Sequence, residues 1–291
     1  MRSVRKIWGI TWRSVIVGVG YLLTLIAIGV MSRILGIQVS GGPGSESILV
    51  WVLISGIVMG LLLGPLASQM PASRWRHFLV WASVIFFNMG SVAIEGAFFA
   101  PALVSIPLPV LFGQQLLASA MAALLITLLF SSPGKTASLI ELLRLRPWYS
   151  WAWRFVVSSL SYLLFYFTFG ALNYTLVTGP YYASHVGGLT VPAPELVLTA
   201  ETIRAPLITL SVVLFVFSLQ TTRRQLALMT GWTLFWIGGV VPLLLRVNAL
   251  PLPLLAASGV EIFFQNFLTG AVAAWLFWTP PLSAAVAGKS P

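Results

Sequence analysis

Long apolar runs separated by short polar segments are the dominant pattern of this chain. Eight runs reach the length of about 20 residues that a helix needs to cross the hydrocarbon core of a bilayer. They lie at residues 14–35, 48–68, 78–98, 110–130, 155–177, 204–221, 226–246 and 254–278. The runs are too long for single strands and lack strict alternation. The pattern therefore predicts an all-α, polytopic integral membrane protein with eight transmembrane helices.

The longest polar interruption, residues 131–154, divides the chain into residues 1–130 and 155–278, followed by a tail at 279–291. The segment SSPG ends the fourth run with residues that break helices. In LIELLRLRPW the leucines gather near one face, as in a short amphipathic helix lying in the headgroup plane. We therefore interpret 131–154 as an interfacial linker, in preference to a docking surface for a membrane or cytoplasmic partner.

The two halves resemble each other. Residues 12–29 align without gaps to residues 153–170, and seven positions are identical, including Trp-Arg, Tyr-Leu-Leu and the final Gly. The second helices begin with Glu-Ser-Ile and Glu-Thr-Ile, and IPLPVL and LPLPLL precede the fourth helices. Because each half has an even number of spans, we expect two four-helix repeats related by a pseudo-twofold axis along the membrane normal.

Charge is scarce and unevenly distributed. Hydrophobic residues make up 58% of the chain and charged residues 8%, whereas soluble domains carry about 25% charged residues. If the N-terminus is cytoplasmic, 13 of the 16 lysines and arginines face the cytoplasm and only Arg33, Arg204 and Arg246 lie outside. This predicts an inner-membrane protein with both termini cytoplasmic. The net charge of +10 then reflects orientation and implies no nucleic acid partner.

The outer segment 178–203 is the longest predicted outer loop. It carries Tyr181, Tyr182 and His185 among prolines and glycine pairs, which we expect to prevent regular structure. The loop covers the outer end of the bundle in one interpretation and is disordered in the other.

Helix 254–278 carries the clearest intramembrane polar stripe: Ser258, Glu261, Gln265 and Thr269. Their spacing places all four side chains on one helical face. An ionisable group inside a span costs on the order of 2.5–3.5 kcal/mol on insertion scales, so Glu261 needs a partner or a function. We expect it to face the bundle interior and to hydrogen-bond Gln115, Asn88, Arg204 or Arg246.

Other intramembrane polar residues extend this candidate site. Helix 155–177 carries Tyr162, Tyr166 and Asn173. The predicted binding residues of an outward-opening cavity are Glu261, Gln265, Glu95, Asn88, Gln115, Arg204 and Arg246. The alternative is that these groups only hold helices together, with each glutamate paired to an arginine.

Several chemistries lack their motifs. The chain has no cysteine and no aspartate, and its two histidines, His77 and His185, fall near opposite sides of the membrane. No HExxH, GxSxG or P-loop motif occurs. We therefore predict no metal and no cofactor.

Three classes of function fit this pattern. A transporter or permease-like subunit for a small amphipathic solute is favoured by the repeat and the polar stripe. A membrane-embedded enzyme that acts on a lipid, with Glu261 as acid or base, is the second. A non-catalytic subunit of a membrane complex is the third.

Overall fold

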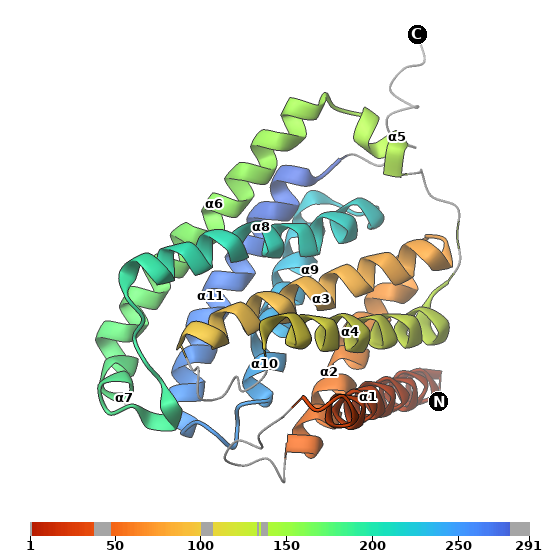
Figure 1. Cartoon of the computed structure of the whole chain (residues 1–291). Coiled ribbons are helices and arrows are strands. Elements are labelled where there is room, and N and C mark those ends of the chain that lie inside the picture. Colours follow the sequence, from red (N-terminus) through yellow and green to blue (C-terminus); the bar gives the residue numbers. More distant parts are fainter. Residues whose placement is uncertain (1, 38–47, 100–106, 133, 135–138, 280–291) are drawn as a thin grey trace.

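The computed structural model describes residues 2–37, 48–99, 107–132, 134 and 139–279, and all of its regular structure is helical (Figure 1). The long helices are α1 (Arg2–Ile34), α2 (Ile48–Gln69), α3 (Arg74–Phe99), α4 (Leu108–Phe130), α6 (Trp148–Asn173), α8 (Pro194–Ser218), α9 (Arg223–Phe235) and α11 (Leu252–Phe277). The short elements are α5 (Leu139–Arg144), η2 (Tyr174–Thr178), α7 (Gly179–Ala183), η3 (Val186–Gly188), η4 (Trp236–Val240) and α10 (Val241–Leu244). Within these ranges, eight helical segments are long and apolar enough to cross a membrane, as predicted.

The first and second sets of four long helices pack in corresponding pairs. In the first set, α1 contacts α2, α3 contacts α4, and α4 also contacts α1 and α2. In the second set, α6 contacts α8, α9 contacts α11, and α11 also contacts α6 and α8. The two sets meet chiefly where α3 packs on α8, in the centre of Figure 1.

Helices α3 and α8 run antiparallel and are joined at both ends by an arginine. At one end Arg76 of α3 donates to the carbonyl of Phe217 at 2.8 Å and to the hydroxyl of Ser218 at 3.0 Å. At the other end Arg204 of α8 forms an ion pair with Glu95 of α3 at 2.9 Å. Carbonyls in the last turn of a helix have no hydrogen-bond donor within the helix. Arg76 supplies such a donor to the Phe217 carbonyl, which lipid chains could not do.

Helices α1 and α2 approach closely because glycines line their contact. A Cβ on Gly56 would lie 2.7 Å from the Cα of Gly18, and one on Gly60 would lie 2.7 Å from the Cα of Ser14. Small residues at such contacts let helices gain van der Waals contact where lipid supplies no hydrophobic driving force.

The prediction that residues 178–203 lack regular structure is wrong. η2 ends at Thr178, α7 and η3 follow it, and α8 begins at Pro194 rather than near residue 204. Pro180 and Pro194 stand in the first turns of their helices, where a missing N–H costs nothing. The chain reverses at His185, which has a φ of 51°, and at two glycines with positive φ.

Basic residues of two separate segments meet at one end of the bundle, around the C-terminus of α11. Arg146 donates to the carbonyl of Trp278 at 3.0 Å, Arg154 to that of Leu276 at 2.9 Å, and Arg223 to that of Trp275 at 2.8 Å. Partial burial lowers the pKa of Arg146, and the charges of Arg154 and Arg223 lower it further. We call this the basic end.

The predicted linker contains a shorter helix than its leucines suggested. α5 has six residues, with Leu142 buried and Leu143 and Leu145 exposed, and α6 begins at Trp148 rather than near residue 155. Residues 280–291 of the predicted tail lie outside the described residues, as does Glu46 in the repeat alignment.

Candidate functional site

A cavity of about 310 Å³ opens among α3, α6, α8 and α11 at the end of the bundle opposite the basic end. Among the described residues of the first half, only α3 contributes to its lining, through Val92, Glu95 and Phe99. The π-helical segments η2 and η4 also border it, through Tyr174, Thr178 and Gly238. Irregular backbone at membrane depth is tolerated where it lines a cavity, and π-helical turns are frequent at functional sites.

Glu201, Arg204 and Glu95 form a charged triad beside this cavity. The guanidinium of Arg204 donates to both oxygens of Glu201, at 2.6 and 2.8 Å, and its other terminal nitrogen lies 2.9 Å from Glu95 Oε2. The Glu201 side chain is 0% exposed, Arg204 6% and Glu95 29%. The triad has one guanidinium and two carboxylates. If both carboxylates are ionised, one negative charge has no positive counterpart within the triad, and Glu95 is the carboxylate that borders the cavity.

Two tyrosines of α6 complete the surroundings of Arg204. The hydroxyl of Tyr162 donates to Glu201 Oε2 at 2.7 Å, and the Arg204 guanidinium carbon lies 5.8 Å from the ring centres of both Tyr162 and Tyr166. Aromatic faces attract cations within about 6 Å. Glu201 therefore takes its partners from the protein and lies outside the cavity lining, whereas Glu95 and Arg204 both line the cavity.

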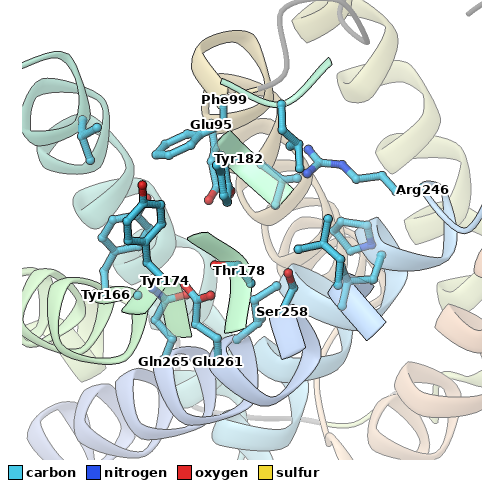
Figure 2. A pocket seen from close by; sticks show the side chains of 18 of the residues that line it. Glu95, Phe99, Tyr166, Tyr174, Thr178, Tyr182, Arg246, Ser258, Glu261 and Gln265 are labelled. Atoms are coloured by element: carbon cyan, nitrogen blue, oxygen red, sulfur yellow. The ribbon is translucent and has the colours of Figure 1, made fainter. Parts of the chain in front are cut away.

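Glu261 enters the cavity from α11 on the other side, as Figure 2 shows. Its Oε2 accepts a hydrogen bond of 2.5 Å from the amide of Asn173 on α6. Its Oε1 lies close to α6, since a Cβ on Gly170 would be 3.3 Å from it. The expectation that Gln115, Asn88, Arg204 or Arg246 would be the partner is wrong, because α6 supplies a neutral amide instead.

The other predicted site residues divide into two groups. Gln265 and Arg246 line the cavity together with Glu95, Arg204 and Glu261, and Ser258 of the predicted stripe joins them. Asn88 and Gln115 are not among the lining residues. Asn88 donates to the Val84 carbonyl at 2.7 Å, and the Oε1 of Gln115 is buried on α4 with no hydrogen-bond partner among the described residues.

Asn88 belongs to the wall behind the cavity. A Cβ on Gly238 of η4 would lie 2.6 Å from the side-chain oxygen of Asn88 and 3.1 Å from the amide nitrogen of Asn266. Glycine at this position lets α3 and α11 bring their amides against η4. Asn266 also donates to the Leu234 carbonyl at 3.3 Å, near the start of the π-helical turn.

Glu201 is a charged residue of the site that the sequence pattern does not single out. It falls within residues 178–203, which the prolines and glycines predict as a loop. The available signal was its spacing from Arg204, since residues three apart on a helix are neighbours. Tyr162 and Asn173 were recognised as polar residues of the fifth span, but their partners were not.

Neither histidine joins the site. His185 is exposed, its Nδ1 lies 3.1 Å from the carbonyl of Leu189, and it is absent from the cavity lining. His77 is buried near the start of α3, at the basic end. In the described ranges, no three His, Cys, Asp or Glu side chains are grouped as metal ligands.

A second hollow of about 1200 Å³ lies between α1 and α4. Its walls are almost entirely apolar, and the amide of Gln114 is tied to the hydroxyl of Ser32 at 3.3 Å. Such a surface suits lipid chains.

Comparison with known proteins gives no relative. No protein-family model, no curated protein and no solved structure matches this chain.

Proposed function

We propose that this chain is a transporter or permease-like subunit whose solute site is the cavity bordered by Glu95 and Glu261. The observation that carries the proposal is the depth of this charged cavity. Glu261 is nine residues from the start of α11, which at 1.5 Å per residue is about 14 Å, or close to half of a bilayer core. Substrate sites of secondary transporters lie near the midplane, beside interrupted helices such as those at η2 and η4.

The internal repeat supports the proposal. Arg13 and Arg154 occupy the same aligned position, and each lies over the ring of the preceding tryptophan, at 5.6 and 4.4 Å. Each also meets the end of the fourth helix of its half, where Arg13 contacts Phe130 and Arg154 the Leu276 carbonyl. Together with the corresponding helix pairs, these contacts favour a pseudo-twofold axis along the membrane normal.

The enzyme alternative has weaker support. Acid–base chemistry on a lipid would need a second titratable group beside Glu261. Glu95 lines the same cavity but is held in an ion pair with Arg204, and His185 lies outside the cavity lining. The subunit alternative gains nothing from the hollow between α1 and α4, since lipid chains fill an apolar groove as readily as a partner helix does.

The test is whether the cavity opens alternately to both sides of the membrane. Because the chain has no native cysteine, Ser258→Cys gives a single reporter in the cavity lining. We expect an impermeant thiol reagent to label it in both right-side-out and inside-out vesicles. Ser68→Cys, exposed at the basic end, is the matched control and reports orientation.

We also propose that the membrane is the cell (inner) membrane and, from the positive-inside rule, that the basic end is cytoplasmic. Ser68→Cys should then react only in inside-out vesicles. Labelling of Ser258→Cys from one side alone would contradict transport, whichever way the protein is oriented.

A further inference from the structure

We propose that the cavity binds a zwitterion: a primary ammonium group between Glu95 and Glu261, joined through a short polar spacer to an anionic group at Arg246. This inference rests on the proposed function, because the zwitterion would be the transported solute. Binding of the zwitterion can nevertheless be measured without measuring transport.

The ammonium half follows from the charges on one side of the cavity. With both carboxylates ionised, the triad carries one more negative charge than Arg204 balances, and Glu95 is the carboxylate of the triad that lines the cavity. Glu261 lines the same cavity, and its hydrogen-bond partner among the described residues is the neutral amide of Asn173. A primary ammonium has three N–H donors and suits two carboxylates at once.

Aromatic rings strengthen this half of the site. Tyr166, Tyr174 and Tyr182 line the same cavity as Glu95 and Glu261, and Figure 2 shows these side chains around it. Ring faces attract an ammonium group in addition to the carboxylates.

Gln265 gives independent support for a ligand. It is 5% exposed and lines the cavity, yet its Nε2 has no hydrogen-bond partner in the described chain. A buried donor without an acceptor is costly, so the site lacks an oxygen that a ligand can supply. Gln265 lies one turn from Glu261 on α11, which places that oxygen close to the ammonium group.

The anionic half follows from Arg246. Arg246 lines the same cavity as Glu261 and Ser258, and Figure 2 shows its side chain entering from the right of the view. The described residues give Arg246 no ion pair, in contrast to Arg204. A half-buried guanidinium of this kind suits a carboxylate or a phosphate, to which it can donate two hydrogen bonds.

The volume of about 310 Å³ is at the lower end of small-molecule sites, about 300–1,000 Å³, and holds a headgroup but no acyl chain. The ligand is therefore a small free zwitterion or the headgroup of a zwitterionic lipid whose chains remain in the bilayer. Both share the same chemistry.

Binding of three related probes to detergent-purified protein tests the inference. Glycerophosphoethanolamine carries both charges, ethanolamine only the ammonium, and glycerol phosphate only the anion. We expect glycerophosphoethanolamine to bind at least tenfold more tightly than either fragment. Glu261→Gln should weaken glycerophosphoethanolamine and ethanolamine on the order of tenfold and spare glycerol phosphate. Arg246→Gln should weaken glycerophosphoethanolamine and glycerol phosphate and spare ethanolamine.

Matched controls separate the site from general charge effects. Glu195→Gln and Arg33→Gln remove the same charges at exposed positions outside the cavity lining and should leave all affinities unchanged. Gln265→Leu is a variant that we expect to stay folded, because it removes a buried donor that has no partner in the described chain. A loss of affinity in this variant is therefore not explained by misfolding. Gln265→Leu should raise or preserve Tm while weakening glycerophosphoethanolamine several-fold.

Nanodiscs distinguish the two sources. If phosphatidylethanolamine discs suppress glycerophosphoethanolamine binding and phosphatidylglycerol discs do not, the ligand is a lipid headgroup; equal binding in both identifies a free zwitterion. The inference is overturned if the zwitterion binds no more tightly than its fragments, or if Glu261→Gln and Arg246→Gln change nothing. If the zwitterion binds but Ser258→Cys is labelled from one side only, the transport proposal alone is overturned. If Ser258→Cys is labelled from both sides but the zwitterion does not bind, only the proposed ligand is overturned.

Discussion

The two first helices of the halves, α1 and α6, carry aligned sequences but meet their neighbours in different ways. α1 lies against α2 through glycines, with backbone close to backbone at Gly56 and Gly60. α6 meets α8 through polar side chains. The hydroxyls of Ser158 and Ser159 lie 3.3 and 3.2 Å from that of Thr209, and Tyr162 donates to Glu201.

Tyr21 and Tyr162 show this difference at one aligned position. Both side chains are fully buried, at 1% and 0% exposure. Tyr162 donates to a buried carboxylate, whereas the hydroxyl of Tyr21 has no partner in the described part of the chain. At this aligned position the first half therefore has close packing, whereas the second half holds a charged group beside the cavity.

The largest expected effect concerns the charge held by the second half. Arg204→Met removes the only cation that contacts Glu95 and Glu201 among the described residues. Because Glu201 would remain buried and unpaired, we expect a loss of about 3–5 kcal/mol in stability. Size-exclusion profiles and Tm in detergent measure it. Arg33→Met, at an exposed position of α1, should match the wild type. An unchanged Tm for Arg204→Met would contradict the role of the triad.

The sequence predicted what depends on local pattern. The number of spans follows from the length of apolar runs, and the polar face of α11 follows from the spacing of Ser258, Glu261 and Gln265. Both are properties of a single segment. Three of the four stripe residues were placed against the cavity by spacing alone, and Thr269 lies deeper, where its hydroxyl donates to the Gln265 carbonyl at 2.6 Å.

The sequence could not predict which helices face each other. The partner of Glu261 is on α6, 88 positions away in the chain, and nothing in either segment indicates that α6 rather than α3 or α8 lies there. Glu201 was missed for a different reason. In the sequence pattern, Pro194 indicates a break in helical structure. In the structure it stands in the first turn of α8, where proline is favourable, so the span begins ten residues before residue 204.

A pair of matched substitutions sharpens the comparison at the aligned tyrosines. Tyr162→Phe deprives Glu201 of one donor, and we expect a loss of about 1.5–3 kcal/mol, typical of a hydrogen bond to a charged group. Tyr21→Phe removes a hydroxyl that has no partner in the described chain, so its effect should be close to zero or stabilising. Tm values of the two variants in the same detergent decide the matter. Equal losses would show that the halves do not differ here.

The smallest expected effect concerns the glycine contact of the first half. In Gly60→Ala the new methyl group would lie 2.7 Å from the Cα of Ser14, a backbone atom that moves only if α1 and α2 separate. Overpacking of this kind costs about 1–3 kcal/mol. Gly29→Ala on α1 is the matched control, because its methyl group would meet nothing within 4 Å. A lower Tm for Gly60→Ala alone, with glycerophosphoethanolamine affinity unchanged, would assign packing to the first half and binding to the second. A comparable loss of affinity would mean that the α1–α2 contact also sets the shape of the cavity, and the division between the halves would fail.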